Sequence, residues 1–254
     1  MDMYQAVLDN AALASSIYVN IALAGLTILV IAFMSRSITD SRANLITMAT
    51  LMISVVSISS YMGLASGLTI DMLEMPEGHP LAGEEVISLW GRYLTWAFST
   101  PFILLALGLL AGSTTDKIFS AIVLDVFMCL TGLAAALTTS SLAMRWFWYA
   151  LSTAFFLGVL YYLLVEWPRE AEKQGTGDIF NTLKLLTVFM WIGYPIVWAL
   201  GNEGLAILEV GTTSWAYSFL DIVAKYIFTI LLVLYVKKEP ESVTSAPATA
   251  SATA

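Results

Sequence analysis

Long apolar stretches alternate with short polar segments along the chain, and this alternation predicts the fold. Each stretch approaches the roughly 20 residues that a helix needs to cross the hydrocarbon core of a membrane. Helices are expected, because lipid offers no partners to backbone N–H and C=O groups. Seven stretches qualify, over residues 14–34, 44–67, 88–111, 117–137, 142–165, 178–200 and 212–236. We therefore predict an all-α membrane protein, a seven-transmembrane-helix bundle that is multi-pass in a cell membrane and surrounded by its lipid.

Composition supports this assignment and excludes several classes of function. Of the 254 residues, 59% are hydrophobic and 12% are charged, whereas soluble domains carry about a quarter charged residues. The net charge of −8 argues against a nucleic-acid partner. The single cysteine, Cys129, excludes an intrachain disulfide. The single histidine, His79, has no second ligand at metal spacing, so we expect a solvated side chain, no metal site and no enzymatic triad.

The polar segments predict the domain boundaries and the orientation. Residues 1–13 form an N-terminal segment, 14–238 the seven-helix domain and 239–254 a disordered, low-complexity tail. The loop over 71–85 contains proline and glycine turn signals, which favour a small hairpin. Lysine and arginine gather in the first, third and fifth loops and in the tail. Positive loops stay cytoplasmic, so the N-terminus is expected to be extracellular and the C-terminus cytoplasmic.

Three ionisable residues fall inside the predicted spans, where charge is expensive and usually functional. They are Arg92 in the third span and Asp221 and Lys225 in the seventh. Asp221 and Lys225 lie one helical turn apart, so they share a face and can pair. One interpretation is a buried salt bridge that only orients helices. The other is that Lys225 attaches a carbonyl compound, because a desolvated amine condenses readily with a carbonyl.

Aromatic residues favour the second interpretation. Trp191, Tyr194 and Trp198 fall on one face of the sixth span, beside Pro195. Such a stripe is more often packing than a cofactor site. Together with a buried lysine in the same bundle, however, these rings would form a sleeve for a long, flat, apolar polyene aldehyde.

Three motifs carry a resemblance to a known family. They are RYLTWAFSTP from Arg92 to Pro101, WIGYPIVWALG from Trp191 to Gly201 and LDIVAK from Leu220 to Lys225. These runs resemble the microbial rhodopsins, and within them the haloarchaeal halorhodopsins. The resemblance covers roughly residues 10 to 238 and all of the predicted spans.

The resemblance implies an all-trans retinal joined to Lys225 as a protonated Schiff base. Asp221 and Tyr194 would belong to its counterion region. Asp125 would lie near the ring end in a structural role, protonated or hydrogen-bonded. The resemblance also implies a homotrimer. The residues implied around retinal are Trp96, Met128, Gly132, Trp148, Ser152, Thr153, Phe156, Trp191, Tyr194 and Trp198.

The charges around Lys225 favour an anion as the transported ion. A protonated Schiff base, Arg92 and Asp221 sum to +1, whereas proton-pumping relatives have a second carboxylate where this chain has Thr95. Thr95 and Ser99 lie one turn apart, so two hydroxyls can point at one ion. At the position of the cytoplasmic proton donor stands Ala106. We therefore predict a light-driven chloride pump whose chloride contacts Arg92, Thr95, Ser99 and Asp221. The resemblance implies that the pump moves chloride inward.

The release path and the rival functions rest on the resemblance. Ala106, Lys184 and Thr187 match positions on the chloride release side, although Lys184 can equally extend to the membrane interface. Glu203 would lie near the outer mouth, either linked to Arg92 through water or facing solvent. The alternatives are a sensory photoreceptor, an outward proton pump and a passive anion channel. The absence of a carboxylate at Thr95 disfavours the first two.

Overall fold

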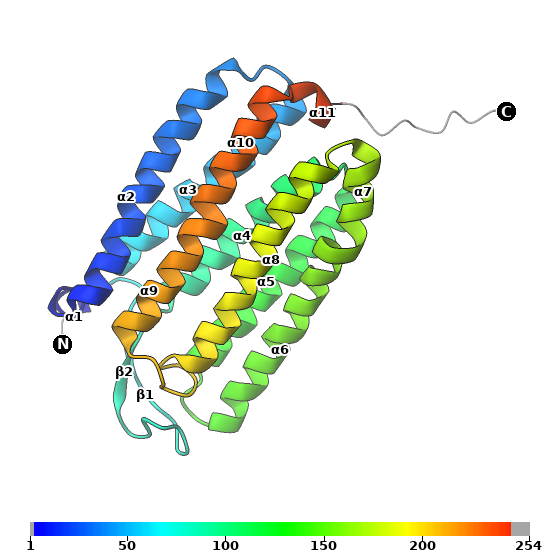
Figure 1. Ribbon diagram of the computed structural model, residues 1–254. Coiled ribbons are helices and arrows are strands. Elements are labelled where there is room, and N and C mark those ends of the chain that lie inside the picture. Colours follow the sequence, from blue (N-terminus) through cyan, green and yellow to red (C-terminus); the bar gives the residue numbers. More distant parts are fainter. Residues whose placement is uncertain (1–2, 245–254) are drawn as a thin grey trace.

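The computed structural model describes residues 3–244 and confirms the predicted seven-helix bundle. Within that range, seven helices are long and apolar enough to cross a membrane. Figure 1 shows them packed side by side along one common direction. The spans are Ala11–Ser37, Ser41–Ala65, Gly91–Leu110, Thr115–Leu137, Leu142–Gln174, Gly177–Leu200 and Val210–Lys238.

Several spans are built from more than one helical element. The short helix α1 (Met3–Asp9) precedes the first span, which joins α2 (Ala11–Met34) to a 3-10 turn, η1 (Ser35–Ser37). The next three spans are α3 (Ser41–Ala65), α4 (Gly91–Leu110) and α5 (Thr115–Leu137). The fifth consists of α6 (Leu142–Tyr161), the π-helical η2 (Tyr162–Glu166) and α7 (Trp167–Gln174). The sixth is α8 (Gly177–Leu200), and the seventh consists of α9 (Val210–Asp221), the π-helical η3 (Ile222–Ile227) and α10 (Phe228–Lys238).

Short polar side chains fix where the first two spans begin. The Asn10 side chain accepts a hydrogen bond from the Leu13 backbone N–H, and the Asp40 carboxylate accepts from Arg42 and Ala43. Such caps satisfy N–H groups that have no partner within the helix. The helices therefore start at polar boundary residues and not where the apolar run begins.

The predicted hairpin is confirmed. Strands β1 (Asp71–Glu74) and β2 (Glu85–Ser88) pair antiparallel, with Asp71 opposite Ser88 and Glu74 opposite Glu85. Figure 1 shows the hairpin projecting from one end of the bundle, which we call the hairpin end. The opposite end carries the last described helix and is called the α11 end.

Sequential helices pack against each other, and α9 also packs against α2. The seventh span therefore closes the bundle against the first. The largest cluster of buried apolar side chains runs from the middle of the bundle to the α11 end, and includes Ile46, Leu107, Leu183 and Val236. The interior at that end is thus filled by aliphatic side chains.

The start of the tail differs from the disorder predicted for residues 239–254. Pro240–Thr244 form a short helix, α11, which packs against α3 and α10. The Tyr235 hydroxyl donates to Ser242 Oγ over 2.9 Å, and Val243 is fully buried. One apolar side chain in a polar segment is enough to anchor this turn to the bundle. The rest of the tail, residues 245–254, lies outside the described residues.

Candidate functional site

A buried ion pair lies in the middle of the seventh span. The Lys225 ammonium nitrogen is 3.0 Å from Asp221 Oδ1, and each side chain is 1% exposed. Asp221 ends α9, and Lys225 lies within the π-helical η3. Such wider turns occur mostly as single interruptions of α-helices, often at functional sites. Apolar periodicity carries no signal for them, so the sequence did not predict η3.

Three further side chains hold the Asp221 carboxylate in one orientation. Tyr61 donates its hydroxyl to Asp221 Oδ2 over 2.6 Å, and Tyr194 donates to Oδ1 over 2.7 Å. The Trp96 indole N–H lies 3.4 Å from Oδ1. These donors come from α3, α8 and α4. Both carboxylate oxygens are therefore occupied by donors of the protein itself.

Arg92 of α4 joins this network through Tyr61. Its NH1 group donates to the Tyr61 hydroxyl over 3.1 Å, so Tyr61 links the guanidinium to Asp221. The guanidinium carbon also lies 5.6 Å from the centre of the Tyr61 ring and 5.5 Å from that of Tyr217. Both distances fall within the range of cation–π attraction. Sequence reasoning did not identify Tyr61 or Tyr217, because a tyrosine inside an apolar span looks like packing.

Two predicted hydroxyl groups continue along α4 from Arg92. Thr95 and Ser99 are 1% and 0% exposed. The Thr95 hydroxyl donates to the Gly91 carbonyl over 3.0 Å. Ser99 Oγ is buried and has no hydrogen-bond partner among the described residues. An unpaired buried hydroxyl costs free energy, so Ser99 is a donor that suits a small anion.

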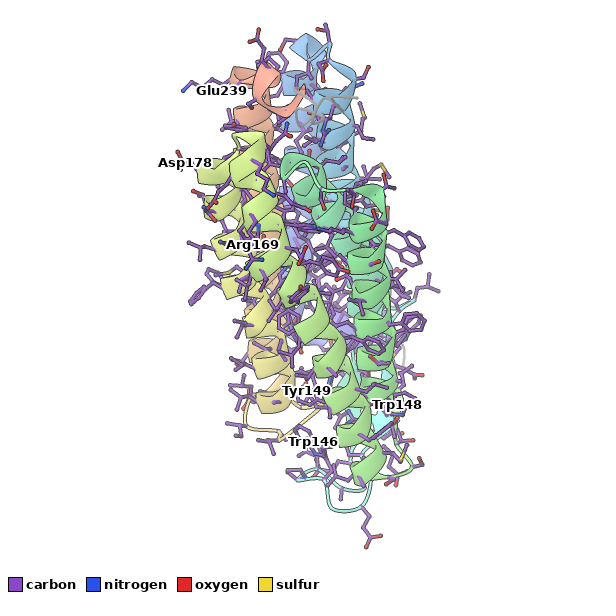
Figure 2. The ribbon with its side chains drawn as sticks, turned by 90° about the vertical axis from the view of Figure 1, so that its right-hand side faces the viewer. Trp146, Trp148, Tyr149, Arg169, Asp178 and Glu239 are labelled. Carbon is purple, nitrogen blue, oxygen red and sulfur yellow. The ribbon has the colours of Figure 1, made fainter. Side chains whose placement is uncertain are left out.

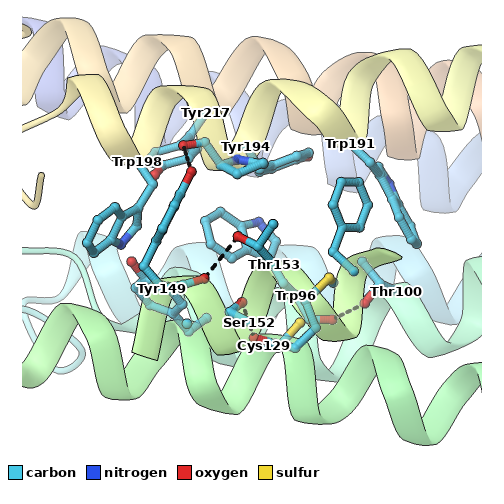
Figure 3. Close-up of a pocket in the computed structure, with 15 residues that line it drawn as sticks. Trp96, Thr100, Cys129, Tyr149, Ser152, Thr153, Trp191, Tyr194, Trp198 and Tyr217 are labelled. Carbon is cyan, nitrogen blue, oxygen red and sulfur yellow. Dashed lines mark hydrogen bonds between the residues drawn. The ribbon is translucent and has the colours of Figure 1, made fainter. Parts of the chain in front are cut away.

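An apolar cavity lies beside the charged network (Figure 3). Its volume of about 100 Å³ is several times the roughly 10–15 Å³ that one water molecule requires. Trp191 and Trp198 stand at its two ends in Figure 3. Trp96 and Tyr194 belong to both the cavity wall and the Asp221 network. The lining residues are Tyr93, Trp96, Thr100, Met128, Cys129, Gly132, Tyr149, Ser152, Thr153, Phe156, Trp191, Tyr194, Pro195, Trp198 and Tyr217.

Trp148, predicted to contact retinal, is not among the residues that line the cavity, and its contact with retinal stays a prediction. It packs against an aromatic cluster that includes Tyr93 and Trp198, two residues of the cavity wall. Its neighbour Tyr149 lines the cavity instead, and its ring stacks on Trp198 at 4.7 Å. Figure 2 shows Trp148 and Tyr149 on α6 toward the hairpin end. Tyr149, Ser152 and Phe156 share one helix face by spacing, so helical periodicity could have found Tyr149.

Comparisons with known proteins identify the family of this chain. A sequence model of the family described as bacteriorhodopsin-like protein matches residues 11–239. The chain belongs to this family. It is 63% identical to halorhodopsin from Natronomonas pharaonis, covering 96% of this chain and 87% of that protein.

Solved structures of the same family superimpose closely. The bromide-bound form of halorhodopsin from Halobacterium salinarum has a TM-score of 0.92 at 57% identity, over 95% of this chain and 100% of that one. A structure described as halorhodopsin, a light-driven chloride pump, has a TM-score of 0.92 at 57% identity, over 93% and 99% of the two chains.

Membership of the bacteriorhodopsin-like family implies retinal as the cofactor, and the residues fit this group. A fully enclosed amine, Lys225, stands beside a cavity walled mainly by aromatic rings. Trp96 and Tyr194 connect the two, because both touch Asp221, the ion partner of Lys225. These residues would suit retinal, with Lys225 as the attachment point, Asp221 as the counterion and the cavity as an apolar sleeve.

Asp125 lies deep in α5, next to the cavity. It is 0% exposed, and its Oδ2 accepts a hydrogen bond of 2.6 Å from Thr100. Asp125 Oδ1 has no partner among the described residues. The hydrogen-bonded state expected for Asp125 is confirmed. Thr100 itself lines the cavity.

A second charged group occupies the hairpin end. The Glu203 carboxylate is 8% exposed and accepts from the Tyr93 hydroxyl over 2.8 Å. Burial raises the pKa of the Glu203 carboxyl above its usual value. Glu203 and Arg92 both line a small cavity of about 10 Å³, room for about one water molecule. Of the two positions considered for Glu203, the buried one near Arg92 is therefore observed.

The expectation of a solvated His79 is wrong. His79 is 4% exposed, and its Nδ1 accepts from the Leu81 backbone N–H over 3.1 Å. Burial, followed by the charge of Arg145, lowers the pKa of His79. The hairpin loop folds back over the bundle, a tertiary contact that the acidic loop sequence does not reveal.

The predicted release residues lie toward the α11 end. Ala106 and Thr187 are both 0% exposed, and Thr187 Oγ1 has no partner among the described residues. Lys184 is half-buried and donates to Asn181 Oδ1 over 2.7 Å. Thr187 thus points into the protein interior, whereas Lys184 is tied to its own helix.

Proposed function

We propose that this chain is a light-driven inward chloride pump with retinal joined to Lys225 as a protonated Schiff base. One observation carries the proposal: Arg92 and Lys225 outnumber Asp221 in a buried network, which leaves a net charge of +1 among these three side chains. The similarity to halorhodopsins supports it, since one is described as a light-driven chloride pump and another holds bromide.

The residues around the cavity would hold the chromophore. Lys225 provides the amine, and Trp96, Trp191 and Trp198 provide flat apolar walls. When bound, retinal supplies light absorption and the isomerisation that drives transport. Because protein interiors are close-packed, these rings would limit how the protein around retinal can move.

The anion would lie near Arg92, Thr95 and Ser99, close to the lysine end of the cavity. One unit charge at 4 Å contributes about 4 kcal/mol at an effective dielectric of 20. A chloride ion near both cations is therefore strongly attracted, and its presence neutralises the excess charge. Ser99 contributes an unoccupied hydroxyl donor.

The same residues do not support proton transport. Thr95 cannot accept a proton as a carboxylate would, and Ala106 cannot donate one. Asp221 is the remaining carboxylate of the network, and its two oxygens are occupied by Tyr61, Tyr194, Trp96 and Lys225. A proton-transfer path would therefore lack an acceptor on one side of Lys225 and a donor on the other.

The charges at the two ends of the bundle support an orientation in the membrane, and the inward direction of transport is proposed from the resemblance to halorhodopsins. The hairpin end, with the N-terminus, is proposed to be extracellular, because the lysine- and arginine-rich loops lie at the other end. Chloride would enter past Glu203 toward Arg92 and leave past Ala106 and Thr187. Lys184 would act at the cytoplasmic surface.

The proposal is tested by illuminating cells that express the pigment in unbuffered chloride salt while external pH is recorded. Inward chloride transport makes the interior negative, so protons follow and the medium becomes alkaline. A protonophore should enhance this signal, and replacement of chloride by sulfate should remove it.

Two other outcomes would contradict the proposal. Acidification that a protonophore abolishes would show an outward proton pump. A pigmented protein without any light-driven signal would point to a sensory photoreceptor. An otherwise identical Lys225→Ala sample controls for direct effects of light on the cells.

A further inference from the structure

Arg92 contacts one buried serine, Ser214, which is backed by a second, Ser16, and the charge argument uses neither. Its NH2 group lies 2.6 Å from Ser214 Oγ and 3.3 Å from the Ser214 carbonyl oxygen. Ser214 Oγ is in turn 2.6 Å from Ser16 Oγ. Both serines are 0% exposed. The contacts connect α4, α9 and α2, three different spans.

The donor and the acceptor in each of these hydrogen bonds follow from the chemistry of the groups. A guanidinium has no acceptor, so Ser214 Oγ must accept from Arg92. The Ser16 hydroxyl donates to the Leu13 carbonyl over 2.7 Å. Each hydroxyl has a single hydrogen, so that of Ser214 goes to Ser16. The result is a one-way relay from Arg92 through Ser214 and Ser16 to Leu13, which we call the serine relay.

The serine relay adds a contact at NH2 to those that Tyr61 and Tyr217 make with the guanidinium. Tyr61 and Tyr217 lie against the guanidinium, and Tyr61 also accepts from NH1. The relay engages NH2. Arg92 Nε is buried and has no partner among the described residues. The held orientation therefore leaves the Nε–H group available to an additional acceptor.

We propose that Ser214 and Ser16 are positioning residues that set the affinity of the site for its anion by aiming the Nε–H of Arg92. This inference rests on the proposed function. A charge alone attracts an anion from any direction, whereas a charge-assisted hydrogen bond requires alignment. Without the serine relay, Arg92 would keep its charge, but its Nε–H would no longer be aligned with the anion.

The test is a chloride titration of the purified pigment, read from the shift of its visible absorption maximum. We expect Ser214→Ala to raise the half-saturating chloride concentration roughly tenfold, since hydrogen bonds to charged groups are the stronger class. Ser16→Ala should raise it less, because Arg92 keeps its direct acceptor. Ser214→Thr keeps a hydroxyl and should restore most of the wild-type affinity. At saturating chloride, the maximal transport rates should stay within about a factor of two of wild type.

Ser15→Ala is the matched control. Ser15 lies on the same helix and accepts from the Trp215 indole N–H across the same α2–α9 contact, but it is exposed and does not touch Arg92. If Ser214→Ala and Ser16→Ala bind chloride like Ser15→Ala, the serine relay has no positioning role and the inference is overturned. A wild-type pigment without any chloride-dependent shift would instead overturn the proposed function, and the relay with it.

Discussion

The two halves of the bundle differ in what they bury. From Lys225 toward the hairpin end, the interior holds Arg92, Arg145, Glu203 and Asp221. The Tyr61 hydroxyl links Arg92 to Asp221, and Arg145 donates to the backbone carbonyl of Glu203. Toward the α11 end, Ala106 lies among aliphatic neighbours, and the buried carboxyl of Asp125 beside the cavity is hydrogen-bonded to Thr100. Other polar side chains buried toward that end, such as Thr187, are neutral.

This asymmetry explains how a single site can impose a direction. An anion in the polar half can approach the buried cations Arg92 and Lys225, whereas the apolar half opposes its passage because an isolated charge is costly in a poorly solvated interior. Passage through the apolar half then requires energy, and light would supply it. The following predictions test this division of roles, starting with the largest effect.

Replacing Lys225 removes the group at the boundary between the halves. We expect Lys225→Ala to abolish both pigment formation and light-driven transport, because no other buried amine is present among the described residues. Visible absorption after addition of retinal measures the first effect. Lys184→Ala, which removes a half-buried lysine on α8, should still form pigment. Covalent pigment in Lys225→Ala would contradict the assignment.

Adding a carboxylate should make the polar half electrically neutral. Thr95→Asp brings the sum of the buried charges from +1 to zero, so the half-saturating chloride concentration should rise by tenfold or more. Thr95→Asn has nearly the same shape without the charge and should show a clearly smaller change. A chloride titration of both pigments measures the difference. Equal affinities in the two variants would refute the charge argument.

Removing a hydroxyl from the apolar half should affect release and not binding. Thr187→Val keeps the shape of the side chain and loses its unpaired hydroxyl. We expect a several-fold slower turnover at saturating chloride, with the half-saturating concentration unchanged. Flash photolysis and chloride titration measure the two quantities. Thr182→Val, an exposed hydroxyl on the same helix, is the control. A loss of chloride affinity in Thr187→Val would indicate a role in binding and contradict the role in release.

The smallest expected effect concerns pH and the hairpin end. The pKa of Glu203 is raised in the folded protein above the reference value of 4.5. The folded state therefore binds the proton more tightly than the unfolded state, so stability is greatest below pH 4.5 and falls as pH rises through the folded pKa. Glu203→Gln should flatten this dependence and shift the unfolding midpoint by a few degrees. Thermal unfolding between pH 4 and 7 measures it; an unchanged slope would contradict the pKa direction.

The sequence predicted the spans well because each requires a long apolar run, and no alternative satisfies the backbone in lipid. Arg92, Asp221 and Lys225 were found for the same reason, since charge inside a span is conspicuous. Tyr61, Tyr217 and Ser214 were missed, because tyrosine and serine are ordinary in such helices and their roles depend on which helices meet. His79 was wrongly expected to be solvated, because the way its loop folds is a tertiary feature.

The central claim is that the net positive charge at Lys225 selects an anion and excludes protons. The most direct test is the light-driven current of oriented membranes at zero driving force, with equal solutions on both sides. We predict a current that moves negative charge inward, saturates with chloride, disappears in sulfate and does not depend on pH between 6 and 8. A current that persists in sulfate and follows proton concentration would contradict the claim, and a current that vanishes at zero driving force in chloride would show a passive channel.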